Sequence, residues 1–323
     1  MIQSIDVQEY NKVINHPLQS WEWGEVRLAL GTEIVRVGVY KGEKLIDAYQ
    51  MSIHPIPATP YKIGYIPRSA IPPAEVIAYF TEYARQNKII FIKFEPYVFE
   101  EAIVSKQMVV SVHPLFTPWT QILDLRLSDE ELKKRLKSKT RYNIGLAQRK
   151  GVTVKYENND RGFDTFIKLY FETCHRQHYF GHNETYHKAV WNNLKQKVAH
   201  ILIAYYEDTP LAAYELFLFK NHWYYVYGGT SDLQRNLMAS NLLMWEAVKL
   251  GKKLGAHTFD MWGSLPPQYD GHDPWAGFTR FKEGYGTVYK KTVGSYDLVI
   301  NKTLYAGYNI AQKLRTKLLE IFG

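Results

Sequence analysis

The order of predicted secondary-structure elements constrains this chain most, because the same order occurs twice. The first half carries two strands joined by a tight turn, then a third strand, a helix and a continuous apolar strand, at 33–40, 45–54, 61–67, 74–87 and 89–94. The second half repeats this order at 200–206, 211–220, 223–229, 240–254 and 257–261. Matching landmarks lie about 165 to 170 residues apart, a period that indicates duplicated domains rather than a solenoid.

The length of the chain agrees with a duplication. A single hydrophobic core rarely grows beyond about 250 to 300 residues, and this chain has 323. We predict a first domain at 1–150, whose C-terminal basic helix bridges to the second copy. A second domain is predicted at 151–300, followed by a basic amphipathic helix at 301–323. The predicted fold class is α+β, with mixed sheets flanked by helices.

Charge narrows the class of partner. A net charge of +8 favours a polyanion such as nucleic acid, a phosphorylated small molecule or anionic lipid.

The start of the chain lacks a basic end followed by an apolar core, so we expect no signal peptide. The single cysteine, Cys174, excludes an internal disulfide and suits a reducing compartment. We therefore expect a cytoplasmic protein without a membrane-spanning segment.

A basic stretch at 128–150 is the candidate surface for RNA. Ser128 and Glu131 form a capping-box pattern at its start, and we predict one helix from there to Gly151. The candidates for contacts with a nucleic-acid backbone are Lys137, Lys139, Arg141 and Lys150. A solvated helix face is one alternative, and a peripheral contact with the anionic inner leaflet of a membrane is another.

The repeated order is typical of N-acyltransferases of the GNAT type. In such enzymes, a loop at a helix N-terminus binds the pyrophosphate of coenzyme A, and 234–239 occupies that place here. Leu237 stands where a glycine would allow the phosphate to come close, which argues against coenzyme A. An acyl-CoA-dependent N-acyltransferase acting on a sugar or polysaccharide precursor is therefore kept only as an alternative, and we expect no cofactor.

Several short phrases, in order along the chain, resemble the Fem-type (FemABX) aminoacyltransferases that build peptidoglycan interpeptide bridges. They lie at 19–24, 65–68, 139–144, 151–152, 172–176, 227–229, 243–246 and 277–286. Some members carry a long helical-hairpin arm in the second domain, and this chain has no such insert, so it resembles the compact, FemX-like kind. The resemblance implies two GNAT-like domains that transfer an amino acid from aminoacyl-tRNA to the stem-peptide amine of a UDP-linked or lipid-linked muropeptide. A non-catalytic protein that binds tRNA or the precursor is a further alternative.

The same resemblance implies roles for individual residues. Lys282, next to Phe281, matches a lysine near the reacting centre that orients phosphate or stabilises an oxyanion. Glu95 matches a proposed general base, and it either accepts the amine proton or positions the peptide; Asp260 carries the same ambiguity in the second copy. Arg176 and Tyr227 match the neighbourhood of residues that bind the precursor, and Arg68 belongs to the matching phrase 65–68. Arg27 departs from the family, which often has lysine there, but its guanidinium can make a bidentate contact with phosphate, so Arg27 and Arg68 are also expected to bind the precursor.

Four histidines have spacings that make a metal site conceivable. They are His175, His178, His182 and His187. No carboxylate joins them and only Cys174 could complete the set, so we expect no metal.

Overall fold

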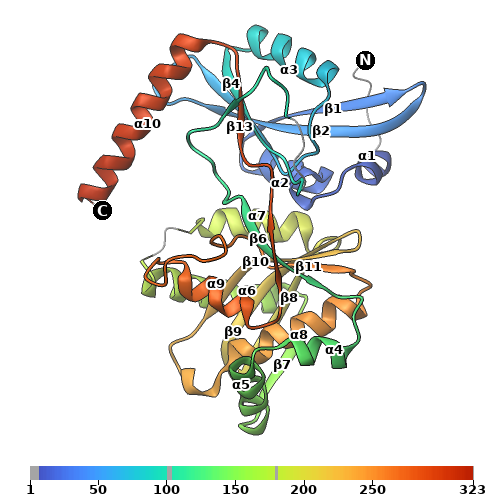
Figure 1. The fold of residues 1–323 in the computed structure, drawn as a ribbon, viewed down its shortest axis with the longest axis vertical. Helices are drawn as coiled ribbons and strands as arrows, with labels where there is room; N and C mark the ends of the chain where they lie inside the picture. Colours follow the sequence, from blue (N-terminus) through green and yellow to red (C-terminus); the bar gives the residue numbers. More distant parts are fainter. Residues whose placement is uncertain (1–6, 100–103, 179–180, 323) are drawn as a thin grey trace. The chain divides into compact units, whose positions relative to one another are not determined.

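A computed structural model describes residues 7–99, 104–178 and 181–322 (Figure 1). The chain divides into two compact units, which are described separately. Unit 1 comprises Met1–Pro118 with Lys291–Gly323, and unit 2 comprises Trp119–Lys290.

Unit 1 contains a six-stranded mixed sheet in the order β1-β2-β3-β4-β13-β5. Its strands are β1 (Glu33–Lys41), β2 (Lys44–Pro55), β3 (Lys62–Pro67), β4 (Ile89–Glu95), β5 (Val109–Val110) and β13 (Tyr296–Val299). Strands β3 and β4 run parallel, and the helix α3 (Ala74–Gln86) connects them. A buried core that includes Met51, Ile66, Phe80 and Phe94 joins α3 to the sheet.

The remaining helices of unit 1 are α1 (Val7–Val13), the 3-10 helix η1 (Pro17–Gln19), α2 (Trp21–Ala29) and α10 (Lys302–Phe322). Ser20 caps α2 by accepting a hydrogen bond from the backbone N–H of Trp23. The helix α10 is drawn in red in Figure 1. It packs through Tyr305 and Tyr308, whose rings lie 5.1 and 5.2 Å from that of Phe91 on β4. The predicted C-terminal helix therefore forms, and it belongs to unit 1.

Unit 2 contains a seven-stranded mixed sheet in the order β12-β6-β11-β10-β9-β8-β7. Its strands are β6 (Trp119–Asp124), β7 (Val152–Tyr156), β8 (Ala199–Tyr206), β9 (Thr209–Phe219), β10 (His222–Thr230), β11 (Thr258–Asp260) and β12 (Val288–Lys291). Its helices are α4 (Asp129–Arg135), α5 (Ser138–Arg149), α6 (Asp160–Arg176), α7 (Glu184–Leu194), η2 (Arg235–Leu237), α8 (Ala239–Lys253) and α9 (Ala276–Glu283).

Helices lie on both faces of this second sheet. On one face, Leu243 and Val248 of α8 pack against a core that includes Leu216 and Trp223. On the other face, α6 packs against β9 and β10. The approach is closest at Gly229, where an added Cβ would lie 2.4 Å from the backbone of Leu169 and Tyr170. Only glycine fits at this point, so α6 is seated directly on β10.

The predicted duplication is confirmed in the order of elements. Unit 1 carries β1-β2-β3-α3-β4 and unit 2 carries β8-β9-β10-α8-β11, and in each case the helix joins two parallel strands. The predicted fold class, two tandem GNAT-like α+β domains with mixed sheets flanked by helices, is also confirmed. The longest described helix of unit 2, α6, has 17 residues, so no helical-hairpin arm is present in the described part of that unit.

The units divide at 118/119 and 290/291, rather than at the predicted 150/151 and 300/301. The reason is that β6, from before residue 150, pairs with β11 in the second sheet, whereas β13 pairs with β4 in the first. The repeated order of elements along the sequence does not show that a strand from one predicted domain pairs with the sheet of the other. The helix predicted at 128–150 is likewise two helices, because the backbone of Leu136 is extended between α4 and α5. The predicted capping box of Ser128 and Glu131 is present.

None of the helices traced in 7–99, 104–178 and 181–322 combines the length and the apolar character that a bilayer crossing requires.

Candidate active-site residues in the two units

In unit 1, Glu95 lies at the end of β4 and is 2% exposed. Its Oε1 accepts hydrogen bonds from the backbone N–H groups of Leu115 and Phe116, at 2.7 and 3.2 Å, and from Ser295 Oγ at 3.0 Å. Its Oε2 accepts one from the Tyr65 hydroxyl at 2.6 Å. Four donors thus occupy this carboxylate, which favours a positioning role over that of a general base.

Two arginines near Glu95 have no anionic partner among the described residues. Arg68 is 8% exposed, and its guanidinium lies 4.2 Å from the ring centroid of Phe116 and 5.7 Å from that of Tyr97. Within the described residues, neither Arg68 nor the half-buried Arg27 of α2 has a side-chain hydrogen bond or ion pair. A stacked guanidinium without a carboxylate partner is well suited to bind a phosphate or carboxylate ligand.

Arg68 and Arg27 both lie close enough to Tyr65 to affect its pKa. Burial and the adjacent Glu95 raise the pKa of Tyr65 well above its ordinary value, while the charges of Arg68 and Arg27 lower it. The pKa of His54 falls to about 4 because the ring is buried and because Arg27 lies nearby. The structure therefore brings together three of the residues predicted for the site, Arg27, Arg68 and Glu95, around Tyr65.

In unit 2, Lys282 of α9 is completely buried. Its Nζ donates hydrogen bonds to the backbone carbonyl oxygens of Trp262 and Gly263, and it lies 3.5 Å from the centroid of the Phe278 ring. Trp262 and Gly263 both have left-handed backbone conformations, with φ of 55° and 54°. Burial lowers the pKa of Lys282 well below its ordinary value, although Asp260 opposes that shift. The amine is thus held by neutral acceptors and gives up its proton readily.

Asp260 is close enough to Lys282 to affect the pKa of the lysine, and Phe281 precedes the lysine in α9. Asp260, 4% exposed at the end of β11, accepts hydrogen bonds from Thr120 Oγ1 at 2.5 Å and from the backbone N–H of Trp262 at 2.7 Å. It thereby fixes the turn that supplies the carbonyl acceptors of Lys282. Phe281 packs against the core of unit 2, with its ring 5.4 Å from that of Tyr285.

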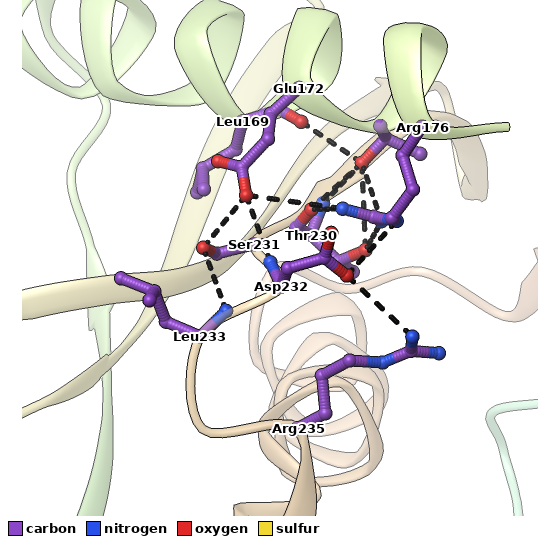
Figure 2. Close-up of polar contacts among 9 residues, drawn as sticks. Leu169, Glu172, Arg176, Thr230, Ser231, Asp232, Leu233 and Arg235 are labelled. Atoms are coloured by element: carbon purple, nitrogen blue, oxygen red, sulfur yellow. Dashed lines mark hydrogen bonds and ion pairs between the residues drawn. The ribbon is translucent and has the colours of Figure 1, made fainter. Parts of the chain in front are cut away.

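Arg176 lies in a dense polar cluster where the end of α6 meets the end of β10 (Figure 2). Its guanidinium donates to the carbonyl oxygen of Thr230 at 2.9 Å and to Thr230 Oγ1 at 2.7 Å, and its Nε lies 3.4 Å from Asp232. Glu172 accepts from Ser231 Oγ and from the backbone N–H of Asp232. In this arrangement Arg176 ties α6 to β10, and a ligand would have to compete for its N–H groups.

Tyr227 lies next to the rings of Tyr170, Tyr186 and His187, a grouping that the sequence did not predict. Its hydroxyl is 3.0 Å from that of Tyr186, and its ring centroid lies 4.8 Å from that of His187 and 6.1 Å from that of Tyr170. Glu215 stands opposite Tyr227 on the neighbouring strand. The available sequence signal was a single carboxylate within the otherwise apolar run 211–219.

The four residues predicted to contact RNA are all exposed, on or beside α5. Lys137 pairs with Glu283 at 2.5 Å, and Arg141 donates to the carbonyl oxygen of Leu136 at 3.1 Å. Lys139 and Lys150 have no side-chain partner in the part of the chain that the structure describes. These two lysines therefore remain the best candidates for a phosphate contact.

The loop before α8 differs from expectation in one respect. Leu237 is 5% exposed and packs into the core of unit 2, so its side chain does not occupy the space in front of the helix. The predicted steric reason against coenzyme A is wrong, because the side chain turns inward. Gln234 and Met238 take left-handed conformations, with φ of 51° and 56°, on either side of η2.

No group of three or more histidine, cysteine, aspartate or glutamate side chains is arranged to hold a metal ion in 7–99, 104–178 and 181–322.

Known proteins resemble this chain over nearly its whole length. The lipid II:glycine glycyltransferase of Staphylococcus epidermidis is 20% identical, covering 95% of this chain and 94% of its own. That of Staphylococcus aureus is 21% identical, covering 92% of each.

Among solved structures, FemX aligns with a TM-score of 0.78 at 19% identity, covering 94% of this chain and 98% of its own. The C-terminal domain of a putative lysylphosphatidylglycerol synthetase from Agrobacterium fabrum aligns with a TM-score of 0.60 at 12% identity, covering 95% and 96%. A model of the FemAB family matches residues 5–114, 110–208 and 203–313. Because these matches span nearly the whole chain, the protein belongs to the FemAB family.

Proposed function

We propose that this protein is an aminoacyltransferase that moves an amino acid from aminoacyl-tRNA to the stem-peptide amine of a peptidoglycan precursor. The observation that carries the proposal is the buried Lys282 within a chain that matches the FemAB family throughout. Relatives named as lipid II:glycine glycyltransferases support acyl transfer in cell-wall synthesis. The charged tRNA as donor is our own inference from the basic surface and the nature of the reaction.

The chemistry is the attack of an amine on an ester. The neutral amine nitrogen forms a bond to the ester carbonyl carbon, a tetrahedral oxyanion develops, and the bond to the ribose oxygen breaks. The amine loses a proton and the departing ribose hydroxyl gains one. Lys282 has three N–H donors when it is protonated. Two of them bind the carbonyl oxygens of Trp262 and Gly263, which hold the side chain in place, and the third is available to the oxyanion. No covalent enzyme intermediate is required.

The precursor fits the neighbourhood of Glu95 in unit 1. Arg27 and Arg68 have no anionic partner of their own among the described residues, so they are free to bind the diphosphate of a UDP-linked or lipid-linked muropeptide. The rings beside Arg68 keep its guanidinium fixed and partly desolvated, which strengthens a charge-assisted hydrogen bond. Glu95, held by four donors, shapes this region rather than accepting the amine proton.

The tRNA backbone fits the exposed basic residues of α5, above all Lys139 and Lys150. Contacts of this kind depend on salt and not on sequence. A lipid-linked acceptor would bring the protein to the inner face of the membrane, where the same lysines would face anionic lipid. Competition between tRNA and anionic vesicles for the protein separates these two uses.

Mass spectrometry of the muropeptide tests the proposal. The purified protein is incubated with UDP-linked muropeptide and a mixed pool of charged tRNAs, and a parallel reaction contains acetyl-CoA and deacylated tRNA. We expect a mass increase equal to one or more aminoacyl residues in the first reaction alone. An acetyl increment in the second reaction would instead support the acyl-CoA alternative. Binding of both substrates without any product would support the non-catalytic alternative.

A further inference from the structure

Glu215 is a buried carboxyl group in unit 2 that lacks a hydrogen-bond partner in the described structure. It lies in the middle of β9 and is 0% exposed, and neither carboxyl oxygen has a hydrogen-bond partner within the described residues. Burial raises the pKa of Glu215 from its ordinary value of 4.5 to about 8. Leaving such a group unpaired is costly, and proteins rarely do so without a functional reason.

Among the described residues, no basic side chain pairs with Glu215. Tyr227 on β10 and Ile201 on β8 flank it in register on the two adjacent strands. Directly opposed residues of adjacent strands project to the same face, so the Tyr227 side chain lies beside that of Glu215. The two side chains also interact electrostatically. The pKa of Tyr227 is raised well above its ordinary value, first by burial, then by Tyr186 and then by the charge of Glu215.

His187 of α7 lies next to the same tyrosine ring. The residue is 0% exposed, and neither ring nitrogen has a hydrogen-bond partner in the part of the chain that the structure describes. Burial lowers its pKa to about 3, with His182 adding to the shift, so the imidazole is neutral. A neutral imidazole has one nitrogen that accepts a hydrogen bond. Tyr170 of α6 also belongs to this group, because its ring centroid lies 4.4 Å from that of His187.

These groups together have the acceptors that a small cation needs. An ammonium group has three N–H donors and no acceptor. Glu215 offers two oxygens and His187 one nitrogen, and the rings of Tyr227 and Tyr170 offer faces for a cation–π contact. Tyr227 is only partly buried, so it connects the buried carboxyl with the surface. An ammonium group bound here would form charge-assisted hydrogen bonds with an ionised Glu215, which would offset the cost of burying the carboxyl group.

We propose that Glu215, Tyr227 and His187 form a binding site for an ammonium group of one of the two substrates. The inference rests on the proposed function for the identity of those substrates. The group is either the α-ammonium of the amino acid on the tRNA or the side-chain ammonium of the stem peptide. Either source fits a site that combines an acidic group, aromatic rings and a neutral imidazole.

A binding measurement tests the site without any need for activity. The probes are glycinamide and Nα-acetyllysine amide, each compared with its neutral N-acetylated form, and the readout is the melting temperature of the full chain at pH 7. We expect only the ammonium forms to stabilise the protein. Glu215→Gln keeps the shape but removes the charge, and it should weaken that apparent affinity at least about tenfold. Equal binding of the neutral forms, or equal binding by the variant, would overturn the site.

A matched control separates loss of the ligand from general effects of a buried substitution. Tyr10 also has a buried hydroxyl without a hydrogen-bond partner, but it lies in unit 1. Tyr10→Phe should therefore leave binding of both probes unchanged. If Tyr10→Phe weakened the binding as much as Glu215→Gln does, the loss of binding would be a general effect of a buried substitution and would not support an ammonium site at Glu215.

The transfer assay then identifies the source of the ammonium group. If Glu215 binds the donor, the wild type prefers glycyl-tRNA over N-acetylglycyl-tRNA, and Glu215→Gln reduces that preference at least about tenfold. If it binds the acceptor, the variant instead raises the KM for the muropeptide by a similar factor. An unchanged preference and an unchanged KM would contradict the inference. A wild type that transfers nothing would refute the proposed function, and the probe measurements would still decide the site.

Discussion

Glu95 in unit 1 and Glu215 in unit 2 are equally buried, at 2% and 0% exposed, yet they differ completely in their partners. Glu95 accepts four hydrogen bonds, whereas Glu215 accepts none in the described structure. The comparison teaches that burial alone does not mark a functional carboxylate. A satisfied group is part of the scaffold, and an unsatisfied one is available to a ligand.

The buried lysines of the two units show the same contrast. Lys93 of β4 pairs with Asp297 of β13 at 3.0 Å and donates to Ser111. Lys282 donates instead to two neutral carbonyl oxygens. The charge of Lys93 is therefore compensated by a direct ion pair within the sheet. Lys282 donates only to neutral oxygens, and the nearby Asp260 does not outweigh the effect of burial on its pKa. We infer that Lys93 holds the fold of unit 1 together and that Lys282 serves chemistry in unit 2.

The largest expected effect is on Lys282. Lys282→Met should lower kcat for aminoacyl transfer by about 10²- to 10³-fold, because it removes a donor to the developing oxyanion. Single-turnover rates with saturating substrates measure the effect. The melting temperature should not fall, because methionine requires no desolvation of a charge. A kcat within about twofold of the wild type would exclude Lys282 from the reacting centre.

Lys93→Met should show the reverse behaviour. It leaves Asp297 buried without its cation, and breaking a buried pair in this way costs on the order of 3 to 5 kcal/mol. Urea unfolding measures this loss, and kcat per folded molecule should stay close to that of the wild type. If Lys93→Met lost activity but not stability, the contrast between the two lysines would be wrong.

Glu215→Gln should change how stability depends on pH. The folded-state pKa of about 8 lies above the ordinary 4.5, so the native carboxyl keeps a proton that the unfolded chain releases. The free energy of unfolding of the wild type therefore falls as pH rises from about 4.5 to 8. The variant has no ionisable group at position 215, so its free energy of unfolding lacks this dependence on pH. Its stability relative to the wild type should increase across this window, by on the order of 3 kcal/mol at pH 7.

Urea unfolding of both proteins at pH 5, 6, 7 and 8 measures that difference. The depressed pKa of His187 affects both proteins equally, so its contribution cancels in the comparison. A difference that is independent of pH would mean that the buried carboxyl is ionised throughout the window.

The smallest effect is expected at Arg68. Arg68→Lys keeps the charge but removes the planar group that stacks on Phe116, so the KM for the muropeptide should rise about tenfold with little change in kcat. Arg126, an exposed arginine that pairs with Asp124 in unit 2, provides the matched control as Arg126→Lys. Similar KM values for all three proteins would remove Arg68 from the precursor site.

The sequence predicted the repeated elements well because their signals are local. Apolar runs such as 89–94 and the capping box at Ser128 need no tertiary context. The assignment of β6 to the second sheet and of β13 to the first could not be predicted, since it depends on pairing between distant strands.

The candidate site was predicted in part for the same reason. The resemblance gave Lys282, Glu95 and Arg68, but not their partners. Glu215 looked like one polar residue in a strand, because its lack of partners within the described residues depends on α6 and β10, which pack against β9. The left-handed backbone of Trp262, which turns its carbonyl oxygen toward Lys282, has no local sequence signal either.

The most direct test of the account follows a labelled amino acid from its tRNA during a single turnover. We expect the label to pass from tRNA to the muropeptide without appearing on the protein, and to do so without acetyl-CoA. Label that stays on the tRNA while the muropeptide and protein are both present and folded would contradict the proposed transfer.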